Sequence, residues 1–392
     1  MILSGGGTAG HIYPALALAD ELRSRQIELS FVGTASGPEA QLAADADIDF
    51  TAISTGGFDR SRPLTLLTSG LKALWGIRQA LSLLKKEHPA AVVCFGGYVS
   101  VPVGIAATMR KIPLIVHEQN SHVGMTNRLL AASANYLALT YPETAGLPQD
   151  MKASCEHIGN PVRKSVHSAD GARARAELGI PTTAQVLLIF GGSRGARNIN
   201  QASLAAAQHL LTQRPNLHIV HGTGKLEYDT VVKGLEKLFE TYPDLRSRYH
   251  ALPYIENMGD VMDSADLVVA RAGATSIAEL TVLGKPSVLI PYPYATDDHQ
   301  TTNAQALVDL GGARLIADKQ LQPKNQAIED QSADYTSGTN EDNPSVFVET
   351  LLELTGNAQM LAAMAKHALD MGKPNAAEAL ADAIVNLLDD KQ

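Results

Sequence analysis

The chain of 392 residues is poor in cysteine, in aromatic side chains and in positive charge. Its two cysteines, Cys94 and Cys155, show no Cys-x-x-Cys spacing, so a reducing compartment is expected and a disulfide framework is not. The formal net charge of −9 argues against a nucleic-acid partner, because phosphate backbones are bound mainly by Lys and Arg. No apolar run reaches the roughly 18 residues of a membrane span, and no signal peptide is visible. These absences predict a cytosolic protein, or one that lies on a membrane surface.

The composition and length of the chain are typical of a globular protein with more than one domain. Apolar residues make up 45% and charged residues 19%, and the length exceeds what one ordinary core contains. Short apolar strands alternate with helices in both halves, which predicts two doubly wound α/β domains with parallel sheets. Residues 159–163 read as the hinge between them. Residues 319–345 are polar and acidic without apolar periodicity, and are predicted to form a solvated, disordered insertion.

The most informative stretch runs from residue 267 to residue 303. An apolar strand at 267–270 meets Gly273, and Ile277, Leu280 and Leu283 then repeat at helical spacing. A strand, a glycine turn and a helix aim backbone N–H groups and a positive helix end at one point, where an anion can bind. Glu279 and Gln300 flank that point in this interpretation, as groups for ribose and sugar hydroxyls. Ser276-x-x-Glu279 is equally a capping box, which would use Glu279 on its own helix.

Further glycine turns follow strands elsewhere in the chain. The first, residues 4–10, is followed by His11 and by a helix predicted over 15–22 with Pro14 in its first turn. Others are predicted at residues 96–100 and 191–198, and polar residues 117–120 follow a strand at 113–116, where open α/β sheets bind ligands. A strand is also predicted at 252–255. One glycine turn alone is a weak signal, because many α/β proteins contain one.

Two other segments allow more than one interpretation. Residues 64–86 form a helical pattern whose apolar residues occupy more than one face of the helix. Core burial is the default for such a helix. The alternative is an amphipathic face that meets a membrane, with Leu71 and Trp75 as apolar contacts and Lys72 and Arg78 at the headgroups. Residues 45–49 contain three aspartates, but they lack ligand-spaced partners and read more simply as the approach to a strand.

Seven motifs in order resemble the MurG family of peripheral-membrane glycosyltransferases over nearly the whole chain. They are GGGTAGHIYPALALA (5–19), GGYVSVPVGIAA (96–107), HEQNSHVGMTNRLLA (117–131), GNPVR (159–163), GGSRGARNIN (191–200), RAGATSIAEL (271–280) and DDHQTTNA (297–304). The resemblance implies a GT-B fold, with two Rossmann-like domains facing a cleft. It implies an N-terminal acceptor and membrane-facing domain (1–162), a UDP-sugar-binding domain (163–371), and a C-terminal helix (372–392) that returns to the first domain.

The resemblance also implies a function and a donor site. The family transfers N-acetylglucosamine from its UDP donor to the 4-hydroxyl of undecaprenyl-pyrophosphoryl-N-acetylmuramoyl-pentapeptide in peptidoglycan synthesis, at the cytoplasmic face of the plasma membrane. Uracil is expected near Ile255, ribose at Glu279, and sugar hydroxyls near Gln300 and Asn120. The full donor set carried over by matching position is Thr8, Ala9, Gly10, Asn120, Arg163, Ser193, Ile255, Ala274, Thr275, Ser276, Ile277, Ala278, Glu279 and Gln300.

The implied chemistry is an inverting transfer that needs a base and a positive pole for the leaving pyrophosphate. His11 is the candidate base, since an unperturbed imidazole has a pKa near 6.5. The alternative is a histidine that satisfies buried backbone groups. Glu118 is the second candidate base, and the HEQN run is equally a scaffold for the acceptor. Gly96, Gly97 and Tyr98 are expected near the acceptor pyrophosphate. Helix ends and backbone N–H groups supply the positive pole, so no metal cofactor is expected.

The chain departs from the family at a few positions, and rival functions remain. Ala9 adds a methyl group where many relatives have Gly, His299 stands where some have Gln, and the 319–345 insertion has no counterpart. One rival is another GT-B transferase with a different lipid acceptor. Another is a non-enzymatic nucleotide-sugar-binding regulator, which would not need His11. The expected partners are the UDP-sugar, the lipid-linked acceptor and an anionic membrane surface, with cell-wall synthesis proteins as further candidates.

Overall fold

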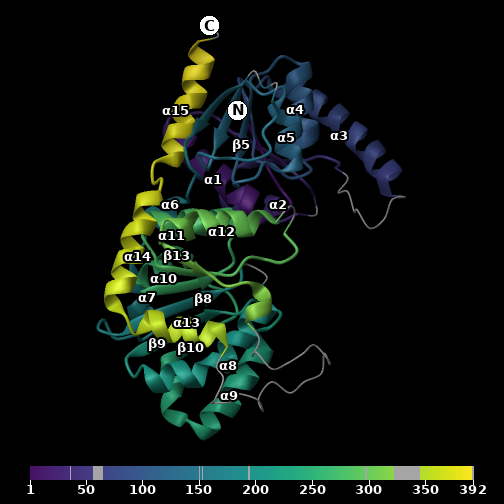
Figure 1. Cartoon of the computed structure of the whole chain (residues 1–392). Helices are drawn as coiled ribbons and strands as arrows, with labels where there is room; N and C mark the ends of the chain where they lie inside the picture. The colour runs from purple at the N-terminus through teal and green to yellow at the C-terminus, as the bar shows by residue number, and fades with distance from the viewer. Residues whose placement is uncertain are drawn as a thin grey trace. The chain divides into compact units, whose positions relative to one another are not determined.

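The computed structural model describes residues 1–35, 37–55, 65–149, 151, 153–192, 195–295, 298–321 and 345–390, with the side chains of 65–71 excepted. The chain forms two compact units, Met1–Lys164 with Lys373–Gln392, and Ser165–Gly372. Arg163, placed by the sequence in the second domain, therefore belongs to the first unit. The predicted insertion falls largely on residues 322–344, which lie outside the described residues. The two units are drawn together in Figure 1 and are described one at a time below.

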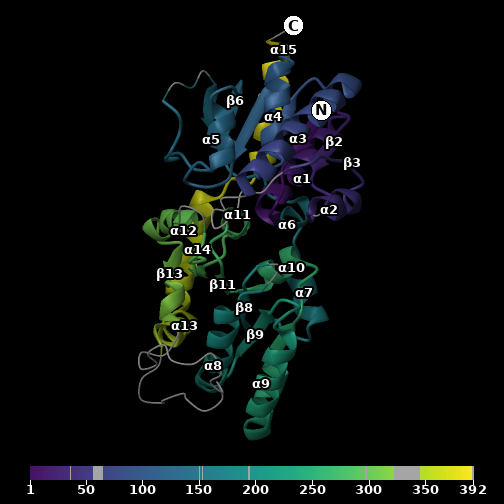
Figure 2. The same ribbon diagram turned by 90° about the vertical axis from the view of Figure 1, so that its right-hand side faces the viewer.

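The first unit is built on a seven-stranded parallel sheet with strand order β3-β2-β1-β4-β5-β6-β7. Alternate strand residues face opposite sides, so Val92 and Cys94 enter one core while Val93 and Phe95 enter the other. Both faces are consequently covered by helices, as a parallel sheet requires (Figure 2). The strands are β1 (Ile2–Ser4), β2 (Ser30–Gly33), β3 (Asp49–Ala52), β4 (Val92–Cys94), β5 (Leu114–Glu118), β6 (Tyr136–Leu139) and β7 (Ser154–His157).

The first helix starts earlier than the sequence suggested. Helix α1 spans Ala9–Ser24 with Thr8 as its N-cap, so the prediction of a helix starting at residue 15 is wrong, and Pro14 lies inside it. The missing Pro14 N–H would have bonded the Gly10 carbonyl, so its loss affects only the first turn. Helices α2 (Glu39–Asp45), α4 (Ser100–Met109) and α5 (Met125–Ala131) follow strands β2, β4 and β5. The C-terminal helix α15 (Ala376–Asp389) packs on α1 and contributes Leu380 and Ile384 to the same core.

Helix α3 (Thr65–Glu87) is amphipathic along its described part. Gly76, Ala80 and Leu84 are buried on the side that packs against α4. Trp75 is 55% exposed, and Lys72 and Arg78 are exposed as well. The default expectation of core burial is therefore wrong for Trp75. Within the described residues, no helix has both the length and the apolar character needed to cross a bilayer.

The second unit repeats the architecture with a six-stranded parallel sheet in the order β10-β9-β8-β11-β12-β13. Its strands are β8 (Gln185–Phe190), β9 (Leu217–Gly222), β10 (Tyr249–Leu252), β11 (Leu267–Ala270), β12 (Ser287–Leu289) and β13 (Ala313–Leu315). The strand predicted at 252–255 is wrong, because β10 pairs with β9 from Tyr249 onward and ends at Leu252. Ile255 consequently lies in the loop after the strand.

Helices cover both faces of this second sheet too. Residues of α8, α9 and α13 share one core with Leu187 and Ile189, and residues of α10, α11 and α12 share the other with Val186 and Leu188. The helices are α6 (Lys164–His167), α7 (Gly171–Glu177), α8 (Arg197–Gln213), α9 (Tyr228–Thr241), α10 (Met258–Ser264), α11 (Ala274–Val282), α12 (His299–Asp309), α13 (Val346–Thr355) and α14 (Ala358–Met371).

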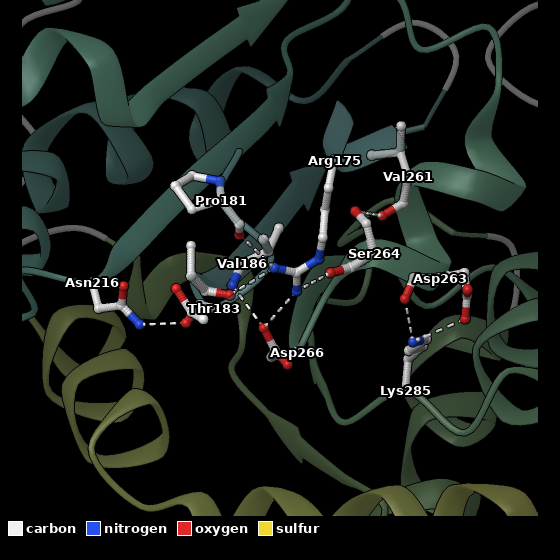
Figure 3. Close-up of polar contacts among 11 residues, drawn as sticks. Arg175, Pro181, Thr183, Val186, Asn216, Val261, Asp263, Ser264, Asp266 and Lys285 are labelled. Carbon is white, nitrogen blue, oxygen red and sulfur yellow. Dashed lines mark hydrogen bonds and ion pairs between the residues drawn. The ribbon is translucent and has the colours of Figure 1, made fainter. Parts of the chain in front are cut away.

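The amino end of the second sheet is held by side chains that bond to backbone. The Arg175 guanidinium donates to the carbonyls of Ala184 (2.7 Å) and Ser264 (2.8 Å) and pairs with Asp266 at 3.3 Å. Asp266 in turn accepts from the Val186 N–H at the start of β8, at 2.8 Å. Figure 3 shows the Arg175 guanidinium with Val186, Ser264 and Asp266 around it. This end of the sheet is thus tied together by polar side chains, whereas its carboxyl end contains glycine turns.

Candidate functional sites at the carboxyl ends of the two sheets

The strand orders locate the ligand-binding edge of each sheet. In a doubly wound sheet, ligands bind beyond the carboxyl ends of the strands, where the strand order reverses. In the first unit this point lies between β1 and β4, and in the second between β8 and β11. The predicted glycine turns follow these four strands. The sequence-predicted motifs therefore gather, unit by unit, at the two edges where this fold binds ligands.

The first two glycine turns pack backbone against backbone. The Gly6 N–H donates to the Gly96 carbonyl at 3.3 Å, and the Ser100 hydroxyl donates to the carbonyls of Gly96 (2.8 Å) and Ser4 (3.1 Å). Gly97 has φ +79°, and a Cβ there would lie 2.2 Å from the Gly6 carbonyl oxygen. Only glycine fits this approach. The fused turns present Gly96, Gly97 and a half-exposed Tyr98 beside the start of α1.

His11 is fixed in one tautomer by the first glycine turn. Its Nδ1 lies 2.9 Å from the Gly6 carbonyl oxygen and 3.3 Å from the Thr8 hydroxyl. A carbonyl oxygen only accepts, so Nδ1 carries the proton and Nε2 is the basic nitrogen of the neutral ring. A Cβ on Gly96 would lie 3.2 Å from Nε2, which places this nitrogen over the second glycine turn. These contacts fix the orientation of the ring within the first unit, and its role as the base stays a prediction.

Glu118 is surrounded by donors. Its Oε1 accepts from the Asn120 N–H (3.0 Å) and side-chain amide (3.1 Å), and its Oε2 from the Gly124 N–H (3.0 Å) and the Asn127 amide (2.9 Å). The residue is buried. Four hydrogen bonds organise the loop from residue 118 to residue 127 around this carboxylate. The geometry favours the scaffold interpretation of the HEQN run over a role as base.

Arg163 and the residues at the start of α1 complete the predicted set in the first unit. The Arg163 guanidinium lies over the Tyr13 ring, 4.2 Å from its centroid, which is a cation–π contact. Tyr13 is one turn beyond Ala9 and Gly10 on α1. These two residues stand in the first turn of the helix, whose N-cap Thr8 makes no side-chain capping bond. The first-turn N–H groups and the positive helix end therefore form a suitable anion platform.

In the second unit, helix α11 begins at Ala274 with Gly273 as its N-cap. Ser276 lies inside the helix, so the capping-box interpretation of Ser276 and Glu279 is wrong. Glu279 is only 4% exposed. The Ile277 side chain is in the hydrophobic core and its N–H donates to the Gly273 carbonyl, so it shapes the helix end rather than presenting a polar group. The backbone from Ala274 to Ser276, with Thr275, supplies the first-turn amides, and Ala278 is half-buried.

Gln300 and Ile255 lie on two other loops of the same edge. The Tyr292 N–H donates to Gln300 Oε1 at 2.9 Å, which ties α12 to the loop after β12 and fixes the orientation of the Gln300 amide. Ile255 is buried against Gly222, where an added Cβ would lie 2.9 Å from Ile255 Cδ1. Both residues thus lie near the carboxyl end of the second sheet, and their contacts to a donor stay a prediction.

The third glycine turn packs on the loop after β9. Gly195 has φ +75°, and a Cβ there would lie 2.2 Å from the Thr223 carbonyl oxygen. That carbonyl accepts from the Asn200 amide at 2.8 Å, and Asn200 Oδ1 lies 3.1 Å from the Nε2 of buried His221. The predicted donor residue Ser193 lies outside the described residues.

Sequence reasoning missed two buried polar residues at the first edge. Glu39 is completely buried and accepts from the Gly7 N–H at 2.8 Å. Asn127 is buried, and its Oδ1 would lie 3.4 Å from a Cβ on Gly96. Both come from segments that follow β2 and β5. The signal that could have found them is the strand order, because loops after neighbouring parallel strands meet at one edge.

The aspartates at 45–49 do not form a cluster. Asp45 ends α2, Asp47 has φ +53°, and Asp49 begins β3. In the described part of the chain, no three His, Cys, Asp or Glu side chains are grouped so that they could hold a metal ion.

Comparisons with known proteins place the chain in a class of enzymes. The model of the glycosyltransferase family 28 N-terminal domain matches residues 1–138, and that of the glycosyltransferase family 28 C-terminal domain matches residues 186–329. Together with the two Rossmann-like sheets, these matches define a glycosyltransferase of the GT-B fold class, as the sequence predicted.

Full-length relatives narrow the class further. The chain is 36% identical over 392 residues to the UDP-N-acetylglucosamine--N-acetylmuramyl-(pentapeptide) pyrophosphoryl-undecaprenol N-acetylglucosamine transferase of Halothermothrix orenii, covering 100% of this chain and 98% of the relative. The same enzyme of Desulforudis audaxviator is 37% identical over 390 residues, covering 99% and 98%. Among solved structures, Acinetobacter baumannii MurG has a TM-score of 0.72 at 28% identity, covering 98% of this chain and 99% of that one. The chain belongs to the MurG family and is a UDP-N-acetylglucosamine-dependent transferase.

The fold is shared more widely than the chemistry. A UDP-GlcNAc 2-epimerase from Neisseria meningitidis, bound to UDP-GlcNAc, has a TM-score of 0.65 at 16% identity over 98% of this chain and 99% of that one. Such a likeness shows the fold alone, so the activity of this chain has to be argued from its own residues.

Proposed function

We propose that the chain transfers N-acetylglucosamine from UDP-N-acetylglucosamine to the 4-hydroxyl of undecaprenyl-pyrophosphoryl-N-acetylmuramoyl-pentapeptide, with inversion at the anomeric carbon. The observation that carries the proposal is the match along the whole chain to enzymes named for this reaction, combined with an oriented histidine at the ligand-binding edge of the first unit. A regulator that only bound the nucleotide-sugar would have no use for that histidine.

In the proposed step His11 Nε2 takes the proton of the acceptor 4-hydroxyl as its oxygen forms a bond to the anomeric carbon. The bond from that carbon to the UDP oxygen breaks, and UDP leaves with the electron pair. The Gly6 carbonyl holds Nδ1–H and accepts a stronger hydrogen bond as the ring becomes positive. Glu118, held by four donors, positions Asn120 and the loop to Asn127 instead of taking the proton.

The donor is proposed to bind the second unit at the start of α11. Glu279 accepts from ribose hydroxyls, Gln300 meets sugar hydroxyls, and Ile255 borders the uracil. The diphosphate takes the positive end of α11, whose N-cap Gly273 makes no side-chain capping bond. The leaving charge is thereby met by backbone dipoles, and the proposed mechanism needs no metal. Activity that persists in excess EDTA would support this part, and loss restored by Mg²⁺ would contradict it.

We further propose that the first unit docks on the cytoplasmic face of the plasma membrane through α3. The undecaprenyl tail of the acceptor stays in the bilayer, so the enzyme has to approach it. Lys72, Trp75 and Arg78 recur every three residues on the exposed side of α3, an apolar ring flanked by cations. Leu74 on α3 and Met125 and Leu129 on α5 are further exposed apolar side chains of this unit.

Vesicle co-sedimentation tests the docking surface. Replacing Leu71 and Trp75 with Ser, and Lys72 and Arg78 with Glu, should abolish binding to anionic vesicles, since each cation contributes about 1 kcal/mol near such a surface. Activity toward a short-chain soluble acceptor should remain, which controls for folding. Replacing Arg246 and Glu236, an exposed ion pair of the second unit, provides a matched surface control. Unchanged co-sedimentation of the fourfold variant would contradict the assignment.

The reaction itself is tested by measuring UDP release from UDP-N-acetylglucosamine with and without the lipid-linked muramoyl acceptor. Release that depends on the acceptor, with a disaccharide product of β configuration, is the expected result. Release only with a different lipid acceptor would favour another GT-B transferase. Tight UDP-sugar binding without any turnover would favour the regulator.

A further inference from the structure

A buried carboxylate lies behind the peptide group that orients His11. Glu39, the first residue of α2, is 0% exposed, and its Oε1 accepts from the Gly7 N–H at 2.8 Å. The Thr34 hydroxyl lies 3.3–3.4 Å from the two carboxylate oxygens. In the described part of the chain the carboxylate is thus held by a backbone amide and a hydroxyl, without a cation in contact. A carboxylate buried in this way is costly, and its presence calls for a reason.

The fold makes room for this carboxylate at several glycines. A Cβ on Gly6 would lie 2.0 Å from Glu39 Oε1, and a Cβ on Gly37 would lie 1.6 Å from Oε2. A Cβ on Gly33 would lie 2.9 Å from the Glu39 Cβ. Three glycines from two segments therefore leave space for one side chain. This packing fixes the carboxylate against the first glycine turn instead of letting it reach solvent.

The decisive geometry is that one peptide group is bonded on both sides. The Gly6 carbonyl and the Gly7 N–H belong to the same planar trans peptide, and they point in opposite directions. The N–H donates to Glu39 Oε1, and the carbonyl accepts from His11 Nδ1 at 2.9 Å. A carboxylate on the N–H side draws electron density toward the carbonyl oxygen, because linked hydrogen bonds polarise one another by an amount of about 10–30% per bond.

We propose that Glu39 is a positioning residue that acts on His11 through the Gly6–Gly7 peptide. The Glu39 carboxylate bonds to one side of the peptide group, and the His11 imidazole bonds to the other. This arrangement holds the proton on Nδ1, keeps Nε2 as the base, and stabilises the imidazolium that forms when the acceptor hydroxyl gives up its proton. Glu39 does this without touching substrate. An Asp bonded directly to a catalytic histidine does the same in hydrolase triads, and here a peptide group stands between the two.

Other charged groups near His11 form a constant background. Glu118 of β5 reaches the neighbourhood through Asn127, beside Gly96, and Arg163 stacks on Tyr13. Farther along α1 lie Asp20, with Arg23 and Lys164 near it, and Arg25, paired with Asp382 of α15. None of these is altered in the variants below, so a change in the titration of His11 reports on Glu39.

The proposal rests on His11 as the base, and its test separates the two ideas. The full chain, labelled with ¹³C and ¹⁵N in histidine, is titrated by NMR while the pH profile of kcat/KM is measured in parallel. Glu39→Gln keeps an acceptor for the Gly7 N–H and removes the charge. The His11 midpoint and the acidic limb of the rate profile should both move down by about 1.5 pH units, as expected for one charge removed about 8 Å away at an effective dielectric constant of about 20.

Thr34→Val is the matched control, because it removes a hydrogen bond to the carboxylate and keeps the charge. Thr34→Val should lower the melting temperature about as much as Glu39→Gln does, and it should leave the His11 midpoint in place. A midpoint that does not move in Glu39→Gln, or that moves equally in Thr34→Val, would overturn the peptide-mediated role. A midpoint that moves without the rate profile would leave that role intact and overturn His11 as the base.

The unaltered protein supplies a measurement that does not depend on a variant folding. The His11 ring should be protonated on Nδ1 when neutral, and the Gly7 amide proton should titrate with the midpoint of His11. A neutral ring protonated on Nε2, or a Gly7 amide indifferent to that titration, would contradict the proposal.

Discussion

In both units a glycine turn at the carboxyl end of the sheet lies against the backbone of a neighbouring loop, Gly97 against Gly6 and Gly195 against Thr223. The chemical groups around these turns differ between the two units. In the first unit the turns are surrounded by ionisable side chains, namely His11, Glu39 and Glu118, and by the Asn127 amide. In the second, α11 starts without a side-chain cap, and its contribution at the edge is backbone N–H groups with one buried carboxylate, Glu279.

The difference teaches that the repeated fold supplies an anion platform twice, while side chains decide what each platform does. A helix end attracts a diphosphate whichever sheet carries it. Proton transfer additionally needs a base with a fixed tautomer, and His11 at the first glycine turn meets that need. The experiments below alter one edge while the other serves as reference.

The largest effect is expected from His11. His11→Ala should lower kcat by about 10²–10⁴ with little change in the donor KM, because a general base contributes in the transition state. His11→Gln, which keeps a hydrogen bond without basicity, should be almost as slow, and the acidic limb of the rate profile should disappear.

Steady-state kinetics of both variants across pH 5–9 checks this. If Gln restores most of the rate and the acidic limb persists, His11 has a positional role, and Glu118→Gln becomes the next variant to measure. UDP binding by calorimetry should be unchanged in each, since the donor site is assigned to the second unit.

The glycine turns can be compared through stability. Gly97→Ala and Gly195→Ala each combine a positive φ with a Cβ 2.2 Å from a carbonyl oxygen, and each should lower the free energy of unfolding by about 3 kcal/mol or more. Gly7 and Gly192 are matched controls: their φ values are +83° and +94°, and an added Cβ would meet no atom within 4 Å. Alanine there should cost only about 1–2 kcal/mol of backbone strain.

Urea unfolding followed by circular dichroism checks these four variants. Equal losses at the crowded and the open positions would show that backbone conformation, and not the close approach of the turns, requires glycine.

Donor affinity is expected to respond to Glu279. If its carboxylate accepts from two ribose hydroxyls, Glu279→Ala loses hydrogen bonds of about 1.5–3 kcal/mol each, and UDP should bind at least about tenfold more weakly. Glu279→Gln should lose less. Calorimetry with UDP checks the ranking, and a lowered melting temperature with unchanged UDP affinity would assign Glu279 a structural role only.

How far the sequence predicted these features depends on whether the signal was local. Apolar strands followed by glycines predicted the two parallel sheets and the position of the turns, because strand and turn preferences are written in adjacent residues. The start of α1 was misplaced because Pro14 resembles a first-turn proline, although helix interiors tolerate one near the start. The end of β10 was misplaced because its register is set by β9.

Site residues were predicted correctly where they lie next to a motif in the same segment. They were missed where a second segment of the chain brings them to the site. His11 follows its own glycine turn and was found. Glu39 reaches that turn from the start of α2, and Asn127 from α5, so neither has a local pattern that marks it. The Ser276 and Glu279 spacing suggested a cap, and the structure assigns the N-cap to Gly273 because the turn, not the serine, ends the extended backbone.

The smallest effect is expected from a buried histidine in each unit, and it concerns acid stability. Burial lowers the pKa of His117 to about 4 and that of His221 to about 3. Unfolded histidine has a pKa near 6.5, so the contribution of each to stability is complete above pH 6.5. As the pH falls below 6.5 the unfolded chain gains protons that the folded chain does not accept. Each histidine then costs about 1.4 kcal/mol per pH unit, down to about pH 4 for His117 and about pH 3 for His221.

His221→Gln should remove one of these two contributions. Its side chain lies between the Tyr249 hydroxyl (2.8 Å) and Asn200 Oδ1 (3.1 Å), so the variant is expected to be less stable at pH 7.5. Between pH 7.5 and pH 5.5, however, it should lose about 1.4 kcal/mol less than the unaltered protein. Urea unfolding at the two pH values gives the difference. Equal losses of stability in the variant and the unaltered protein would mean that His221 takes up a proton in the folded state. The acid sensitivity of the second unit would then have another source, and the paired rings of His218 and His250 would be the next groups to replace.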